Sequence, residues 1–449
     1  MLFLISLIGI VYSTQLTLVK PSLIVPSTKN DSIPVNVADF GYVPYGRSVS
    51  GNLTYIENTC NPLNITLNST IVLTMGSSCK FLSQAMNVQL AGAKMLVIVY
   101  NHEEDISNFL LIAEYGSEQS FIPTMMINKV DGEFLIEKLK SFPDIQVSVT
   151  FELKQQKIVD LQYFLSSFDV FSYLFLEEFF PFAKQMINQL TFNPIYIQFY
   201  CKECEKTGYK ATNQNCISGG RYCAQDPDLD GPLTGREVIM EDLRQLCILQ
   251  QNDLITWWNY MILFNQFCFN DYQDCPSTIM KSISINETKI NYCITDSFTG
   301  NDTLYDDNII LKEQRQQIMR NHQVYWPSLF INGEFYKGDL FLNNVDESTI
   351  FNVDDFAVLE AICDAFLAEF RPQLCDTTGF FSIKEGELTD QKSPIITVLI
   401  WVGISLFICF FLFASFLLIR RMMLKKVRDD IGSQVDNHLK NYFRMPQAQ

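Results

Sequence analysis

Histidine and the common catalytic signatures are scarce or absent in this 449-residue sequence. Of its three histidines, only His102 and His322 precede the long apolar run near the C-terminus. Neither a Gly-x-Ser-x-Gly nor a His-Glu-x-x-His motif occurs. These absences argue against a serine hydrolase, against a zinc protease and against a histidine-rich metal site.

Basic residues are also in deficit, with 33 Lys+Arg against 50 Asp+Glu and a formal net charge of −17. The last thirty residues are the exception, because they carry seven basic and three acidic side chains and leave −21 for the rest. A surface this acidic repels a phosphate backbone and excludes nucleic acid as a partner. It favours basic ligands or cations, or it serves only to keep the protein soluble.

Two apolar runs predict how the chain is placed in a membrane. Residues 1–13 (MLFLISLIGIVYS) have the character of a signal peptide cut after Ser13. Residues 395–419 form a run of 25 without a charge, which spans a bilayer at about 1.5 Å per residue. Five of the next nine residues are basic and predict a cytosolic side. We therefore expect a single-pass type I membrane protein with one transmembrane helix and a cytosolic tail at 420–449.

Cysteines and glycosylation sequons fall on the predicted lumenal side. Of the thirteen cysteines, Cys409 lies in the apolar run and none lies in the tail. The other twelve predict disulfides of an oxidising compartment, with their pairing left open: Cys60, Cys79, Cys201, Cys204, Cys216, Cys223, Cys247, Cys268, Cys275, Cys293, Cys363 and Cys375. Six sequons predict N-glycosylation at Asn30, Asn52, Asn64, Asn68, Asn286 and Asn301.

Hydrophobic periodicity predicts an α/β domain over residues 14–153. Strand-like runs alternate there with segments whose apolar residues recur at helical spacing. The expected strands are 71–75, 95–100, 124–128 and 145–151, and the expected helices are 78–94 and 131–142.

A second domain is expected over residues 154–375. It begins with a strand from 159, a helix over 171–190 and a strand over 194–200, and it contains a cysteine-rich helical insertion at about 201–320. The turn Asn332-Gly333 predicts a hairpin over 326–338, and a helix follows over 354–370. This order is typical of a thioredoxin-like domain. Residues 376–394 are expected to be a linker.

Three segments resemble one family. The stretch CISGGRYCAQDPDLDGPLTGREVIMEDLRQLC (216–247) resembles the central-domain signature of plant-type vacuolar sorting receptors. The stretch SCKFLSQAMNVQLAGAKMLVIV (78–99) resembles part of a protease-associated (PA) domain, and WPSLFINGEFYKGDL (326–340) resembles a later motif of the receptors. The resemblance implies an α/β fold: a PA domain, a thioredoxin-like domain with a disulfide-rich helical insertion, and one transmembrane helix.

The resemblance also implies a function, that of a cargo receptor without enzymatic activity. Such a receptor sorts soluble proteins to the vacuole or lysosome, moving between Golgi, trans-Golgi network and endosome or prevacuolar compartment. Soluble vacuolar cargo would bind at the PA-domain loop Gly76, Ser77 and Ser78. In the tail, Tyr442 and Met445 fit a Tyr-x-x-apolar motif that clathrin adaptor complexes bind in extended form.

The sequence departs from the family in three places. The plant loop Arg-Gly-Asp-Cys is replaced here by Gly76-Ser77-Ser78-Cys79, so cargo specificity should differ. The epidermal-growth-factor-like repeats are missing, since only a short segment separates Cys375 from the apolar run. The cysteine pair after the first thioredoxin-like strand is replaced by SSFDVFSYLF (166–175).

Two other functions stay open. Cys201-Lys-Glu-Cys204 follows a strand and would suit a lumenal thiol-disulfide oxidoreductase-like folding factor, although the residues after it lack the helix that lowers a thiol pKa. A non-sorting surface glycoprotein is the second alternative. A ubiquitin ligase of the PA, transmembrane and RING type is excluded because the tail has no cysteine.

The segment DPDLDGPLTGRE (226–237) has the spacing of an EF-hand calcium loop, with candidate ligands Asp226, Asp228, Asp230 and Glu237. A helix is expected after it, but the glycines and cysteines before it predict no entering helix. The alternative is a solvated acidic turn. Calcium, if bound, would be structural or would modulate cargo release.

Overall fold

The computed structural model describes most of residues 14–377. The gaps are 69, 77–78, 103–104, 107–108, 110, 113–119, 203–213, 229–230, 232, 270–271, 273, 322–324 and 342–356. The predicted signal peptide, most of the linker, the transmembrane run and the tail lie outside the described residues. In the part that is described, no helix is both long and apolar enough to cross a membrane.

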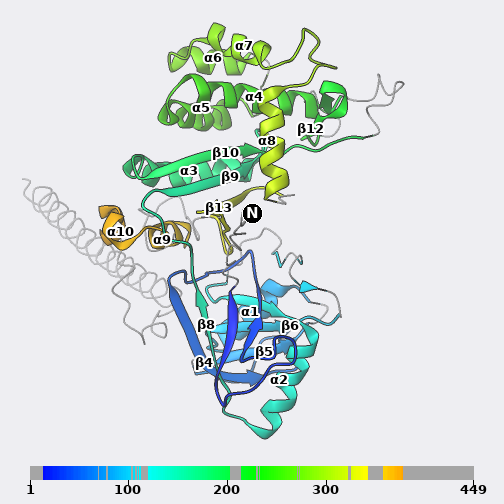
Figure 1. Cartoon of the computed structure of the whole chain (residues 1–449), viewed down its shortest axis with the longest axis vertical. Coiled ribbons are helices and arrows are strands. Elements are labelled where there is room, and N and C mark those ends of the chain that lie inside the picture. Colours follow the sequence, from blue (N-terminus) through cyan, green and yellow to red (C-terminus); the bar gives the residue numbers. More distant parts are fainter. Residues whose placement is uncertain are drawn as a thin grey trace, which may run out of the picture. The chain divides into compact units, whose positions relative to one another are not determined.

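The first domain is built on an eight-stranded sheet with the order β2-β1-β8-β4-β5-β6-β7-β3. Figure 1 labels its strands β4, β5, β6 and β8. Within it, β5 (Ile71–Met75), β6 (Met95–Val99) and β7 (Thr124–Ile127) are neighbours and run parallel. All the residues of β6 and β7 are buried, as expected of parallel strands that are covered on both faces. Helices α1 (Phe81–Leu90) and α2 (Lys129–Ser141) pack on β6. The four strands and two helices expected here are confirmed.

Four strands of this sheet were not expected from the sequence. They are β1 (Gln15–Lys20), β2 (Ser32–Pro34), β3 (Asn36–Val37) and β4 (Arg47–Tyr55). Both β1 and β4 pair with β8 (Gln146–Phe151), and the paired residues are 94 to 133 positions apart in the chain. Such pairing is set by tertiary contacts, and local propensity reports it poorly.

The second domain holds a four-stranded sheet with the order β10-β9-β13-β14. Strands β9 (Val159–Leu165) and β10 (Leu190–Tyr196) are parallel and are joined by α3 (Val170–Gln185). Strand β13 (Ser328–Ile331) follows the cis peptide bond Trp326–Pro327, runs antiparallel to β9 and forms a hairpin with β14 (Glu334–Phe335). This is the thioredoxin-like order predicted from the sequence.

Two helices of this domain end earlier than expected. Helix α3 ends at Gln185 because Leu190 already belongs to β10. Helix α9 (Ala357–Asp364) does not continue to residue 370, since Phe366 forms a β-bridge with Gln156. A short 3-10 helix at Ala368–Phe370 and α10 (Gln373–Thr377) follow.

The helical insertion begins with the short hairpin β11 (Cys216–Ile217) and β12 (Tyr222–Cys223). Its helices, in the upper part of Figure 1, are α4 (Gly235–Gln251), α5 (Leu254–Phe267), α6 (Cys275–Ser282), α7 (Glu287–Asp296) and α8 (Ile309–Arg320). Helix α5 packs on α3, where the buried Trp258 donates its indole N–H to the carbonyl oxygen of Leu176 (2.8 Å). The expected cysteine-rich helical region is confirmed.

The structure also pairs the cysteines. The disulfides are Cys60–Cys79, Cys216–Cys223, Cys247–Cys293, Cys268–Cys275 and Cys363–Cys375. Cys201 is disulfide-bonded as well, and Cys204 lies outside the described residues. Each of these five pairs lies within one domain, so the bonds brace the domains individually.

Candidate functional site

The predicted cargo loop leaves the sheet at the carboxyl ends of two parallel strands. Gly76 follows β5, whose last residue Met75 is in register with Val99 at the end of β6. In sheets of this kind, ligands bind outside the carboxyl ends of the strands. The loop therefore begins where this fold offers a binding site. Ser77 and Ser78 lie outside the described residues.

Gly76 is held tightly between neighbouring backbone groups. Its N–H donates to the carbonyl oxygen of Val99 (2.8 Å), and its own carbonyl accepts from the side-chain amide of Asn101 (3.1 Å). A Cβ atom at this position would lie 2.9 Å from the carbonyl oxygen of Val99. Glycine is required here because the two backbones approach so closely.

The far end of the loop is fixed by a disulfide and by side-chain hydrogen bonds. Cys79 is bonded to Cys60, and its carbonyl accepts from the amide of Gln84 on α1 (3.4 Å). Gln84 also accepts from the hydroxyl of Thr59 (3.0 Å), beside Cys60. The residues on both sides of positions 77–78 are thus anchored.

Helix α1 begins directly after this loop without a side-chain cap. Its N-cap residue, Lys80, makes no side-chain capping hydrogen bond, and its first turn carries no acidic residue. Backbone N–H groups at such a helix start attract anionic or carbonyl groups of a ligand.

Aromatic side chains lie beside the loop, and sequence analysis missed them. The ring of Tyr100 is 5.3 Å from that of His102 and 5.1 Å from that of Phe109, which in turn lies 6.1 Å from Phe81. Tyr100 and His102 flank Asn101, the residue that holds Gly76. The sequence signal was the Tyr-Asn-His run directly after a buried strand.

The acidic segment 226–237 is arranged as turns and a helix cap. The N–H of Asp228 donates to Asp226 (3.3 Å), and the N–H of Leu233 donates to Asp228 (3.2 Å). The carboxylate of Glu237 accepts from the N–H of Thr234 (2.9 Å) in the capping box of α4. Asp230 lies outside the described residues, and among those described no three acidic, histidine or cysteine side chains form a group suited to a metal ion. Calcium binding stays a prediction.

No α-helix enters this acidic segment, as expected from the sequence. Residues 216–223 form the β11–β12 hairpin with a short 3-10 turn between its strands. The segment therefore differs from an EF-hand, in which helices flank the loop on both sides.

The thioredoxin-like turn after β9 is largely buried and is hydrogen-bonded to the helical insertion. The N–H of Ser167 donates to the carboxyl group of Asp242 on α4 (3.1 Å), and its hydroxyl donates to the carbonyl of Val238 (3.2 Å). Asp169 caps α3 by accepting from the N–H of Ser172 (2.7 Å). The turn thus connects the sheet to the helical insertion. Burial raises the pKa of Asp242 well above its usual value.

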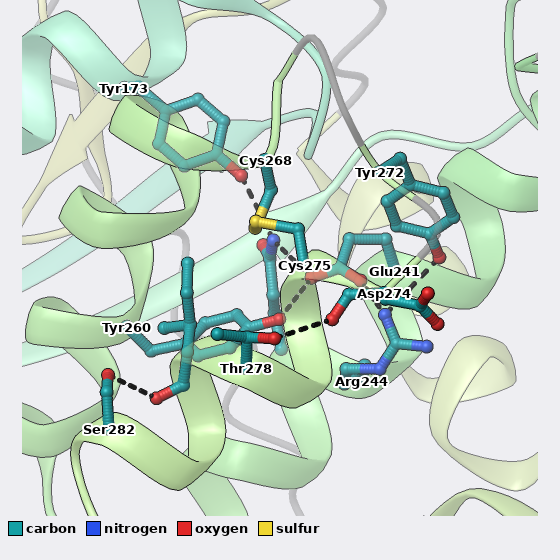
Figure 2. The surroundings of a disulfide bond; sticks show 12 residues. Tyr173, Glu241, Arg244, Tyr260, Cys268, Tyr272, Asp274, Cys275, Thr278 and Ser282 are labelled. Atoms are coloured by element: carbon teal, nitrogen blue, oxygen red, sulfur yellow. Dashed lines mark hydrogen bonds and ion pairs between the residues drawn. A yellow bond between two sulfur atoms is a disulfide. The ribbon is translucent and has the colours of Figure 1, made fainter.

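Next to Asp242 lies a buried network beside the Cys268–Cys275 disulfide (Figure 2). Glu241 forms an ion pair with Arg244 and accepts from the hydroxyl of Tyr260 (2.9 Å). Arg244 also donates to the hydroxyl of Tyr272 (3.3 Å). Burial raises the pKa of Glu241 even though Arg244 opposes the shift. These contacts hold α4 against α5 and the segment before α6, and we assign them a structural role.

The remaining predicted sites are divided between described and undescribed residues. All six sequon asparagines are exposed, and Asn286 also caps α7 through its side-chain oxygen. The adaptor residues Tyr442 and Met445 lie outside the described residues. Glycosylation and adaptor binding therefore stay predictions.

The fold and loop define a protein built from a PA-type α/β domain and a thioredoxin-like domain with a disulfide-rich insertion. Family descriptions match both parts: "PA domain" over residues 35–135 and "Vacuolar sorting receptor thioredoxin-like domain" over residues 171–349. The resemblance to the vacuolar sorting receptor family is thus confirmed in both domains.

Curated relatives extend this likeness along most of the chain. Vacuolar-sorting receptor 1 of Pisum sativum is 27% identical over 407 residues, which cover 82% of this chain and 61% of the relative. Vacuolar-sorting receptor 4 of Arabidopsis thaliana is 26% identical over 390 residues, which cover 76% and 58%. The chain thus spans about three-fifths of the length of the relatives that it matches.

Solved structures align with separate parts of the chain. An aminopeptidase from Aneurinibacillus sp. strain AM-1 has 17% identity and a TM-score of 0.24, and the alignment covers 31% of each chain. MdbA, a thiol-disulfide oxidoreductase from Corynebacterium matruchotii, has 10% identity and a TM-score of 0.28 over 42% of this chain and 81% of its own. No functional conclusion is drawn from likenesses this distant.

Proposed function

We propose that this protein is a type I membrane receptor that binds soluble proteins in the Golgi lumen and carries them to a vacuole or lysosome. The main support is the alignment with vacuolar sorting receptors over 82% of the chain, which includes both domains. The predicted signal peptide, membrane span and Tyr-x-x-apolar motif agree with this route. In this proposed function, the receptor binds and releases cargo without changing it covalently.

Cargo is proposed to bind at the loop Gly76–Ser78. Anchored loop ends, the uncapped start of α1 and the adjacent aromatic rings support this placement. An extended cargo segment would hydrogen-bond to backbone groups and pack an apolar side chain on the rings. Because this loop has no charged residue, recognition would not use ion pairs from the loop itself.

The remaining parts of the proposal concern traffic and cofactors. Clathrin adaptors would bind Tyr442 and Met445 and return the receptor from the endosome or prevacuolar compartment to the trans-Golgi network. The six exposed sequons would carry glycans in the lumen. Calcium at the acidic segment 226–237 would be structural or would modulate release.

The test is capture of soluble precursors by the immobilised full-length protein, at pH 7 and at pH 5, with calcium and with a chelator. The decisive variant is Asn101→Ala, which removes the hydrogen bond that holds Gly76. We expect selective capture at pH 7, and a loss of roughly five- to tenfold in affinity for the variant, because one hydrogen bond contributes about 1 kcal/mol.

The matched control is Ser48→Ala, which removes an exposed hydroxyl pair with Thr150 on β4 and β8. It should leave capture unchanged. Equal capture by both variants would show that cargo binds elsewhere than at the loop Gly76–Ser78. Capture of no soluble protein under any condition would refute the receptor function.

A further inference from the structure

The two lumenal domains meet at a joint that is rich in charged side chains. Asp39 of the PA domain accepts from the ammonium group of Lys337 (2.6 Å) and from the hydroxyl of Tyr325 (3.1 Å), both on the thioredoxin-like domain. The N–H of Asp339 donates to the carbonyl of Gly41 (3.0 Å). These contacts join the loop before β4 to the segment around β14.

A second set of contacts joins the same loop to α9. Glu360 on α9 accepts from the guanidinium of Arg47 (2.5 Å) and from the hydroxyl of Tyr42 (2.6 Å). The side chain of Glu360 is only 6% exposed, and that of Arg47 is 31% exposed. The ion pair is therefore largely removed from water. In such a low-dielectric environment the Coulombic attraction between the two charges is stronger, but their desolvation is costly.

Backbone approaches leave little room for water in this joint. Gly46, with φ of +74°, lies so close to α9 that a Cβ atom would be 2.2 Å from the carboxylate of Asp364. Gly338, with φ of +108°, would place a Cβ atom 3.0 Å from the carbonyl oxygen of Gly41. The rings of the buried Tyr45 and Tyr336 lie beside it, tilted to each other with centroids 5.5 Å apart. Separating the domains would expose all these groups to water.

Carboxylates outnumber cations among the described residues of the joint. Asp39, Glu360 and Asp364 pair with Lys337, Arg47 and Arg371 respectively, whereas Asp339 accepts from the backbone N–H of Phe341 (3.4 Å). Burial is the main cause that raises the pKa of each of these four carboxyl groups. The other titratable groups that interact with them are Glu152, Tyr42, Tyr45, Tyr325 and Tyr336, and Glu334 lies near Tyr45.

The direction of the pH effect follows from these shifts. Undocked carboxyl groups regain water and titrate near their usual pKa of about 4, whereas the docked groups have raised pKa values. The docked state therefore binds more protons in the window between the two values. Its stability is fully present below the usual pKa and is lost as pH rises through the raised pKa.

We propose that protons control the docking of the PA domain on the thioredoxin-like domain, so that the joint is held more firmly at acidic than at neutral pH. Acidic compartments would thus fix the orientation of the two domains. This proposal does not depend on cargo binding.

Hydrogen exchange of the purified full-length protein, measured by mass spectrometry between pH 5 and pH 7.5 without cargo, tests it. After correction for intrinsic exchange rates, segments 38–47 and 334–341 should be better protected at pH 5 than at pH 7.5. The gain is up to about tenfold for each carboxyl group whose pKa differs by one unit between the docked and undocked states. The core strand β5 (71–75) is the internal reference.

Two variants probe the two sets of contacts separately. Glu360→Gln and Asp39→Asn keep the shape but cannot titrate, so each should reduce the pH dependence of protection at the joint. Asp144→Asn replaces an exposed carboxylate of the PA domain and should behave as the parent protein. If Glu360→Gln does not fold, Asp39→Asn provides the same test. Protection of the parent joint that is constant, or lower at pH 5, would overturn the proposal.

Discussion

Two turns of this molecule occupy the same topological position, but they differ in how their polar groups are hydrogen-bonded. Each connects a parallel strand to the following helix: residues 76–80 join β5 to α1, and residues 166–169 join β9 to α3. At the first, the side chain of Lys80 makes no capping hydrogen bond; at the second, Asp169 caps α3 and Ser167 bonds to α4.

The difference comes from what packs on each turn. The helical insertion covers the turn after β9, and its Asp242 and Val238 take up the polar groups of Ser167. The PA-domain turn is anchored at its ends by Gly76 and Cys79, with its neighbour His102 exposed. A strand end becomes a binding site only where no other element of the fold satisfies its polar groups. Four substitutions test this contrast, in order of expected effect.

Glu241→Ala should have the largest effect, because it breaks the buried support under the closed turn. It leaves Arg244 and the hydroxyl of Tyr260 without their shared acceptor. Breaking a buried ion pair by removing one partner costs about 3–5 kcal/mol, which denaturant unfolding would measure. Glu241→Gln, which retains an acceptor, should cost less, and equal losses would contradict the assigned role of the ion pair.

Asp242→Asn should change the pH dependence of stability. Because burial raises the pKa of Asp242, the parent protein loses stability as pH rises through that raised value. The variant cannot ionise and should lose less over the same range, by about 1.4 kcal/mol for each pKa unit of the shift. Denaturation curves from pH 5 to pH 9 provide the measurement. Parallel pH profiles of stability for parent and variant would show that ionisation of Asp242 does not cause the loss.

Asp169→Ala should weaken the capped helix α3. It removes the acceptor of the Ser172 N–H, and loss of an N-cap costs about 0.5–2 kcal/mol. Thermal unfolding would show a lower midpoint, with Asp169→Asn as the control that keeps a capping oxygen. A midpoint unchanged in the alanine variant would mean that the cap is dispensable.

Lys80→Asp should have the smallest effect on stability and the opposite sign. It offers a capping carboxylate to the open start of α1, whose N-cap backbone is already extended (φ −59°, ψ 139°), and should stabilise the domain by about 0.5–1 kcal/mol. The new carboxylate would occupy the N–H groups proposed for cargo, so capture should fall while stability rises. Lys80→Ala removes the cation without adding a cap and separates the two effects. Unchanged capture by Lys80→Asp would exclude the helix start from the cargo site.

Much of the fold could be predicted from local pattern. The buried run Met95–Val99 and the helical spacing around Leu135 identify their elements because burial on a sheet or a helix face imposes a period on the sequence. The turn Asn332-Gly333 gave the hairpin, since both residues adopt positive φ there. The cargo loop at Gly76–Ser78 stays a prediction, and the aromatic residues beside Asn101 were not predicted from the sequence.

Overlapping signals explain what local pattern could not decide. Glu237 stands at the twelfth position of a calcium-loop spacing, and it also stands three residues after Thr234, as in a capping box. In the folded chain its carboxylate bonds to the backbone of Thr234. One sequence stretch can satisfy two patterns, and only the surroundings determine the contacts that its side chains make.

The sequence by itself determined the succession of strands and helices from β5 to β10 and the cysteine-rich character of the insertion. These properties depend on neighbours a few residues apart, whose periodicity records which face is buried. Tertiary structure alone decided that β1 and β4 pair with β8, that Cys247 bonds to Cys293 and that Asp242 closes the turn at Ser167. Those contacts join residues tens to more than a hundred positions apart, and their energy exists only once the chain has brought them together.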